Sequence, residues 1–158
     1  MVKGSAPPRE SNQRRNFYIG KKQKNIQSCA LEIVEYYKDH KPYTFGQALC
    51  RCMEELEITV ANLSARTGIS ERQIGRMRND KVKDIEFRTI IAVCIGLNIV
   101  TETSERLLNL KRYTLNCDEP YVQLCKMFLG VRISVEECNE ILKSLGFEPL
   151  TDGEIWVA

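Results

Sequence analysis

Apolar residues recur at helical spacing along most of this chain. Between residues 28 and 145 they form successive stripes three and four positions apart, such as Phe45, Leu49 and Met53. This spacing places apolar side chains on one face of an amphipathic helix. No run alternates between apolar and polar residues as a half-buried strand would. The pattern therefore predicts an all-α fold with about seven helices.

Several predicted helix ends carry recognisable capping residues. Thr44 with Gln47, and Ser134 with Glu137, have the spacing of capping boxes. Asp118 precedes Pro120, which predicts a helix start with Asp118 as the cap and proline in the first turn. Glycine at the end of an apolar stripe predicts a helix end, at Gly130 and Gly146.

The stretch from Thr59 to Asn79 has the form of a helix-turn-helix. Thr59 is placed to cap a helix that ends near Gly68, where glycine suits a tight turn with positive φ. Ile69 follows as a buried turn residue, and Ser70 is placed to cap a second helix. In this motif the second helix enters the DNA major groove.

The second helix would present polar side chains to DNA if Ile74 and Met77 face the core. Arginine can bind guanine with two hydrogen bonds, glutamine can do so with adenine, and glutamate can accept from cytosine. The candidate base contacts are Glu71, Arg72, Gln73 and Arg76. The candidate phosphate contacts are Thr59, Ser70, Arg78, Lys81 and Lys83. A solvated charged face that binds nothing is the alternative interpretation.

Charge is distributed unevenly along the chain, although the net charge is only +2. Residues 1–27 are basic and rich in Pro and Gly, which predicts a disordered arm. The arm either contacts DNA or serves as a solubilising tail. Residues 28–114 are predicted to form the DNA-binding domain with an added N-terminal helix. Residues 115–158 are acidic and are predicted to form a helical extension.

The seven cysteines do not have the spacing of a metal site or a disulfide framework. Their number is odd, and His40 is the only histidine, so we interpret them as small thiols in a reducing cytosol. The chain has no phosphate-binding loop, no metal cluster and no membrane-spanning run. We therefore expect a cytoplasmic protein that is not an enzyme and needs no cofactor or metal.

From Thr44 to about Thr114 the chain resembles the lambda-repressor-like, Cro-type (XRE) DNA-binding domain. The resemblance implies a five-helix domain, usually dimeric, that binds an operator with two half-sites. Apolar stripes before and after this region predict additional helices at its N- and C-terminal ends. The residues that carry the resemblance are Leu63, Gly68, Ile69, Ser70, Ile74, Met77 and the segment Ile90 to Ile99.

Several positions differ from the usual pattern of that family, among them Ser64 in place of alanine and Asp84-Ile85 in place of a loop proline. Val60 and Ala61 stand where relatives often have polar residues that touch phosphate. Asp80 stands where glycine is common, and Gly75 lies inside the second helix of the motif. Helix-interior glycine costs about 1 kcal/mol relative to alanine.

These observations predict a sequence-specific, non-catalytic regulator that binds double-stranded DNA, with a homodimer as its expected form. The alternative is a protein-interaction module that keeps the fold but has little or no DNA binding. The C-terminal helices either pack on the domain, form a dimer interface or bind a protein partner.

Overall fold

The structure, a computed structural model, describes residues 25–39, 44–153 and 155. These residues form eight α-helices and no strand, which confirms the all-α prediction. The chain divides into two compact units, residues 1–42 and 43–158. Residues 1–24 of the predicted basic arm lie outside the described residues.

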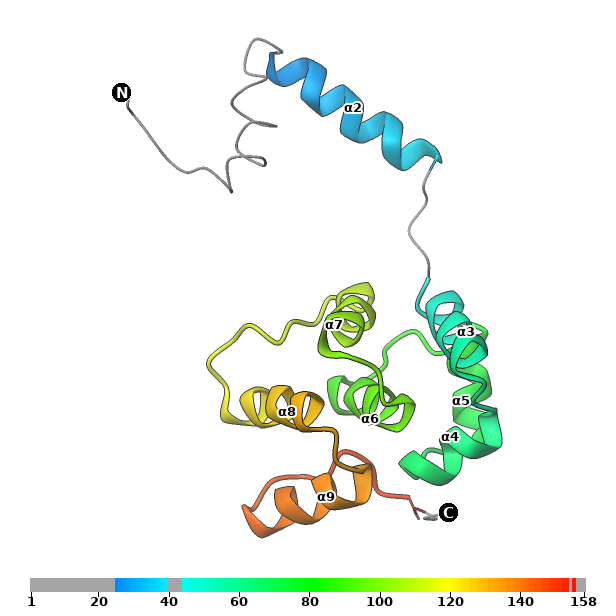
Figure 1. Ribbon diagram of the computed structural model, residues 1–158, viewed down its shortest axis with the longest axis vertical. Coiled ribbons are helices and arrows are strands. Elements are labelled where there is room, and N and C mark those ends of the chain that lie inside the picture. The colour runs from blue at the N-terminus through cyan, green and yellow to red at the C-terminus, as the bar shows by residue number, and fades with distance from the viewer. Residues whose placement is uncertain (1–24, 40–43, 154, 156–158) are drawn as a thin grey trace. The chain divides into compact units, whose positions relative to one another are not determined.

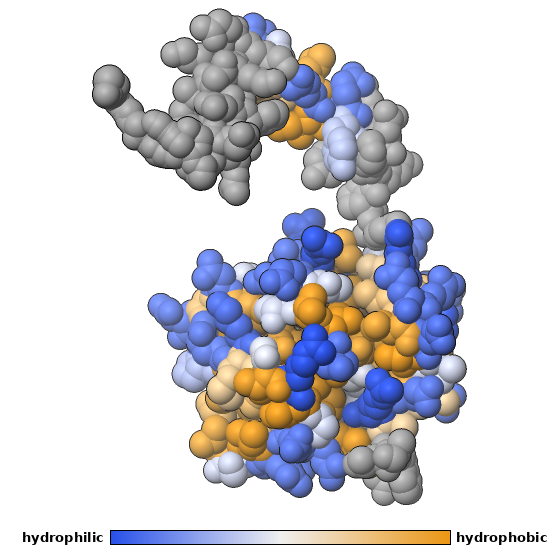
Figure 2. Space-filling model, viewed as in Figure 1, coloured by the Kyte–Doolittle hydropathy of each residue, from blue (hydrophilic) through white to orange (hydrophobic). Residues whose placement is uncertain are grey.

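The first unit contains the helix α2 (Ile26–Asp39). It begins two residues before the predicted start, and Asn25 accepts a hydrogen bond from the Ser28 amide (2.8 Å) at its first turn. Its apolar side chains are exposed: Ile26 is 86% exposed and Leu31 61%. Figure 2 shows this apolar surface in orange. The predicted apolar stripe is therefore helical but is not buried within this unit.

The second unit is a bundle built around α6 (Phe87–Leu97). This helix is apolar on all sides, from Ile90 to Leu97, which is typical of a helix enclosed by others. In Figure 1 it lies at the centre, with α3 and α5 on one side and α7 and α8 on the other. The surrounding helices are α3 (Phe45–Leu56), α4 (Val60–Thr67), α5 (Glu71–Arg78), α7 (Thr101–Leu110), α8 (Pro120–Val131) and α9 (Val135–Ser144).

Local capping signals predicted some helix ends correctly and others incorrectly. Both capping boxes are present, at Thr44 and at Ser134. The prediction for Asp118 was wrong, because Glu119 is the N-cap residue of α8 and forms no side-chain cap. Gly130 also does not end α8. The helix continues to Val131, and Arg132 ends it in the left-handed conformation (φ 58°).

The C-terminal helices pack on the domain and extend its core. Phe128 of α8 and Leu142 of α9 are fully buried, and both helices contact α6. The apolar stripe of α3 is buried at Phe45, Leu49 and Met53, whereas Leu56 at the end of the helix is 43% exposed. Within the described ranges, none of the helices has both the length and the apolar composition needed to span a bilayer.

Candidate nucleic-acid interface

The predicted helix-turn-helix is formed by α4, α5 and the turn between them. The Thr59 hydroxyl accepts from the Asn62 amide, and the Ser70 hydroxyl accepts from the Gln73 amide, both at 3.1 Å. Gly68 ends α4 with φ 83°, a conformation that glycine adopts without steric cost. Ile69 is buried in the turn. The two caps and the turn glycine are therefore confirmed.

The turn is also held by a segment from the other end of the unit. The Thr151 hydroxyl donates a hydrogen bond to the Thr67 carbonyl. Gly153 lies directly against Gly68: a Cβ atom on Gly153 would be 1.9 Å from the Gly68 carbonyl oxygen. The sequence offered no local signal for this contact between distant residues.

The orientation of α5 follows from its two buried side chains. Ile74 and Met77 are 0% and 1% exposed, so they fix the inward side of the helix. At about 100° per residue, the opposite arc carries Arg72, Gly75, Arg76 and Asn79. No carboxylate lies on this outward arc. It is therefore a basic and polar surface.

The four candidate base contacts occupy different parts of α5. Arg72 and Arg76 are exposed on the outward arc. Glu71 is exposed on one flank, and Gln73 is half-buried on the other. The Arg76 guanidinium donates to the Lys81 carbonyl (3.2 Å), so this side chain extends toward the C-terminal end of α5. The structure thus brings Arg72 and Arg76 together on one arc, and the other two flank it.

The candidate phosphate contacts differ in their exposure and in their hydrogen bonds. The Thr59 and Ser70 hydroxyls each cap their own helix. Arg78 is half-buried, and its Nε atom donates to the Cys50 sulfur (3.4 Å). The other two, Lys81 and Lys83, are exposed in the loop after α5.

A further cation, Lys111, lies beside this loop. Its Nζ atom donates to the Lys83 carbonyl (3.1 Å). Sequence reasoning missed Lys111 because it follows α7 and is far from the motif along the chain. It adds a third lysine to the region next to α5.

Asp80 links the end of α5 to the start of α3. It adopts φ 55°, and its carboxylate accepts from the Thr44 hydroxyl (2.7 Å) and the Gly46 amide (2.9 Å). The two helices approach so closely that a Cβ atom on Gly46 would lie 2.5 Å from the Arg78 carbonyl oxygen. The departure from the family pattern at Asp80 therefore has a structural role.

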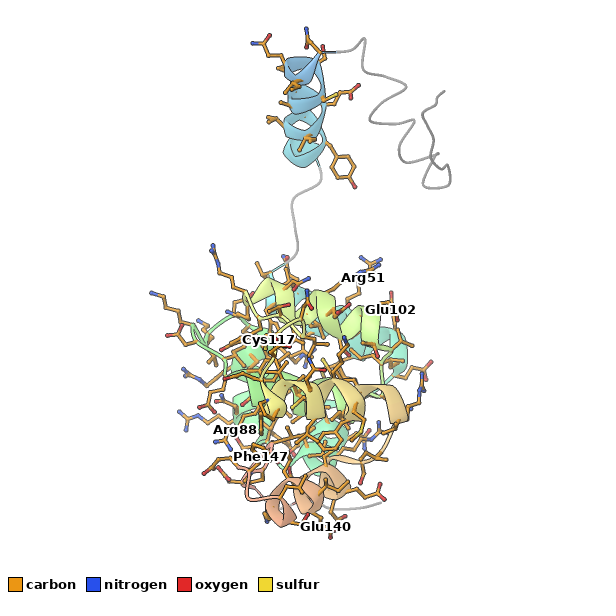
Figure 3. All side chains as sticks on the ribbon, turned by 90° about the vertical axis from the view of Figure 1, so that its left-hand side faces the viewer. Arg51, Arg88, Glu102, Cys117, Glu140 and Phe147 are labelled. Carbon is orange, nitrogen blue, oxygen red and sulfur yellow. The ribbon has the colours of Figure 1, made fainter. Side chains whose placement is uncertain are left out.

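Arg88 fastens the segment after α9 to the start of α6. Its guanidinium donates to the Pro149 carbonyl (2.8 Å) and lies 3.5 Å from the Asp152 carboxylate. Beside it is a hollow of about 850 Å³ with aromatic walls that include Phe87, Tyr121 and Phe147. Figure 3 shows Arg88, Cys117 and Phe147 on this face. No residue of α5 lines the hollow, so it is separate from the outward arc.

All seven cysteines are free thiols in the structure. Cys94, Cys125 and Cys138 are buried, and burial raises the pKa of each of these thiols to about 12. Buried, protonated thiols are poor metal ligands and poor nucleophiles. In the described part of the chain, no three His, Cys, Asp or Glu side chains are grouped closely enough to hold a metal ion.

Comparison with known protein families agrees with this geometry. Residues 48–103 match the family model described as the Cro/C1-type HTH DNA-binding domain. The matched region runs from α3 into α7 and includes the whole of α4, α5 and α6. Searches of curated proteins and of solved structures returned no significant match.

Proposed function

Because residues 48–103 match the family model of the Cro/C1-type HTH DNA-binding domain, we propose that this chain is a sequence-specific DNA-binding regulator of transcription. The observation that carries the proposal is the outward arc of α5, where Arg72 and Arg76 are exposed and no carboxylate intervenes. Arginine on this arc can bind two atoms of guanine in the major groove.

The candidate phosphate contacts that support this proposal lie after the C-terminal end of α5 and at the starts of α4 and α5. Lys81 and Lys83 are exposed in the loop that follows the helix, and Lys111 is hydrogen-bonded to that loop. The caps Thr59 and Ser70 lie at helix starts, where backbone amides attract phosphate. Contacts of this kind set the orientation of a protein on the duplex, while base contacts give specificity.

We infer that the DNA-bound form is a homodimer. A symmetric pair would present two α5 helices to half-sites about 34 Å apart, one turn of DNA. The operator would then be an inverted repeat, because the symmetry of the protein is matched by that of its site.

Selection of bound duplexes from a random pool tests both parts of the proposal. We expect an enriched inverted repeat, and we expect the Arg72→Ala and Arg76→Ala variants to bind it more weakly by about 1–3 kcal/mol each. Arg106→Ala is the matched control, because Arg106 is exposed on another helix, α7. Equal affinity for all duplexes, or equal effects of the three changes, would contradict base contact by α5.

A protein-interaction module is the second candidate function. The observation in its favour is the start of α4, where Val60 and Ala61 offer no side-chain hydrogen bond to phosphate. Exposed apolar side chains, such as Val131 of α8 and Leu145 directly after α9, give a partner a surface to contact. Absence of any DNA complex at low salt, with stable co-purification of a protein, would favour this alternative.

A further inference from the structure

Gly75 is the fifth residue of the eight-residue helix α5. A glycine in a helix interior destabilises the helix by about 1 kcal/mol relative to alanine. Here the protein itself gives no reason for that cost, because a Cβ atom added to Gly75 would have no neighbour within 4 Å.

Two other helix glycines of the unit, Gly46 and Gly96, differ from Gly75 in this respect. A Cβ atom on Gly96 would lie 2.5 Å from the Thr67 methyl group, and one on Gly46 would lie 2.5 Å from the Arg78 carbonyl oxygen. Those two positions need glycine because helices pack closely there. Gly75 instead faces open space.

The side chains next to Gly75 do not occupy the space into which a Gly75 side chain would point. Asn79 donates from its amide to the Gly75 carbonyl (3.0 Å), so this side chain lies back along the helix. Arg76 extends toward the Lys81 carbonyl. The middle of the outward arc therefore carries no side chain in front of the Gly75 Cα atom, and Arg72 lies one turn before it.

We infer that Gly75 is the point at which the backbone of α5 lies directly against the DNA. Glycine is the residue that allows such a close approach between a backbone and a ligand. A side chain at this position would hold the helix out of the major groove and pull Arg72 away from the base edges. This inference rests on the proposed function, and it specifies how deeply α5 enters the major groove.

Substitution by alanine gives opposite expected effects on folding and on binding. Gly75→Ala removes a helix-breaking residue without a clash, so we expect a higher thermal unfolding midpoint. We also expect at least tenfold weaker binding to the duplex selected for the wild type. Binding to a scrambled duplex of equal length should stay within twofold, because it depends on phosphate contacts and not on entry into the groove.

Gly130 provides the matched control. It lies within α8, and a Cβ atom added there also has no neighbour within 4 Å. Gly130→Ala should therefore raise the unfolding midpoint while leaving the affinity for both duplexes unchanged. The experiment compares the full-length wild type, Gly75→Ala and Gly130→Ala by gel mobility shift and by thermal unfolding.

Each other outcome overturns a defined part of the inference. Wild-type affinity in Gly75→Ala, or equal losses on selected and scrambled duplexes, would show that DNA does not approach Gly75 closely. A lower unfolding midpoint would contradict the open space around this residue. If the wild type binds no duplex, both the proposed function and this inference are wrong.

Discussion

At the scale of single residues, Asp80 joins two helices through a backbone conformation that most residues avoid. Its φ of 55° is in the left-handed region, which Asn and Asp tolerate better than other side chains except glycine. Glycine at this position would remove the strain but also the two hydrogen bonds to Thr44 and Gly46. The carboxylate therefore supplies, for α3, a capping interaction from outside the helix.

Replacing Asp80 should destabilise the second unit in a graded way. We expect Asp80→Ala to lower the free energy of unfolding by about 2 kcal/mol, because it loses both hydrogen bonds and keeps the strain. Asp80→Gly should lose less, and Asp80→Asn least. Urea unfolding of the three variants measures the order, and an alanine variant as stable as the wild type would contradict the linking role.

The buried thiols predict a specific dependence of stability on pH. Burial raises the pKa of Cys94 from 9.0 to about 12, so the folded state keeps the thiol proton at pH values where the unfolded state loses it. The stabilisation is complete below pH 9 and is lost as the pH rises toward 12. For one such thiol the slope is about 1.4 kcal/mol per pH unit.

Cys94→Ala tests this dependence. Its free energy of unfolding, measured by urea from pH 8 to pH 10.5, should fall less steeply than that of the wild type. The comparison uses slopes, because the substitution also changes core packing at every pH. Parallel curves for the two proteins would argue against a raised pKa at Cys94.

Local chemistry made several of these residues predictable. Thr59, Gly68 and Ser70 act on neighbours within a few positions, so their roles follow from the sequence. Asp80, Gly46 and Lys111 act on residues 28 to 36 positions away. No local pattern marks such contacts, because they arise only when α3, α5 and α7 pack together.

At the scale of elements, the segment after α9 is part of the support of the helix-turn-helix. Asn139 of α9 accepts from the Leu150 amide (2.7 Å), and Arg88 donates to the Pro149 carbonyl. These bonds direct the chain toward Thr67 and Gly68, where Thr151 and Gly153 meet the turn. The helix-turn-helix therefore depends on residues outside the region that matches the family.

Gly153→Ala should disrupt this support. The added methyl group would overlap the Gly68 carbonyl oxygen, and backbone atoms cannot move aside as a flexible side chain does. We expect the segment to detach from the turn, with a loss of about 1–3 kcal/mol of unfolding free energy. Thermal unfolding of the variant and the wild type measures this loss.

The control for that prediction is Thr151→Val, which removes only the hydroxyl that donates to Thr67. Its loss should be smaller, about 1 kcal/mol. If Gly153→Ala is as stable as the wild type, the close contact between the two glycines does not form.

Helix existence was more predictable than helix boundaries. Apolar spacing identified α8, and Pro120 is in its first turn as predicted. Proline at the first helical position makes the preceding residue the N-cap, which is Glu119 and not Asp118. Gly130 permits a helix end but does not require one, and α8 ends only where Arg132 adopts the left-handed conformation.

At the scale of the whole molecule, charge rather than shape decides how strongly a DNA-binding protein depends on salt. In the second unit, Arg72 and Arg76 of α5 and the lysines Lys81, Lys83 and Lys111 beside its C-terminal end form the basic surface. Seven further cations lie in residues 1–24, outside the described residues. The contributions of these two groups of cations to DNA binding can be measured separately. Each phosphate that a protein neutralises makes log affinity depend more steeply on log salt concentration by a fixed amount.

Neutralising Arg14, Arg15, Lys21 and Lys22 with glutamine tests whether the arm binds DNA. Log affinity falls as log salt concentration rises. We expect this negative slope to become shallower by about 0.9 for each phosphate that the arm no longer neutralises. Changing Lys126 and Lys143, which are exposed on α8 and α9, is the control. An unchanged slope in the arm variant would favour the solubilising tail.

The bond between Thr151 and Thr67 has a consequence for synthesis on the ribosome. These residues are 84 positions apart, so at typical elongation rates Thr151 is added roughly 4 to 17 s after Thr67. For most of that interval, once Arg78 has been added, the nascent chain contains α4, the turn and α5 without the segment that holds the turn. The helix-turn-helix therefore reaches its final stability late in translation. A premature stop codon shortly before Thr151 would yield a chain that contains all the helices of the described residues but has an unsupported turn.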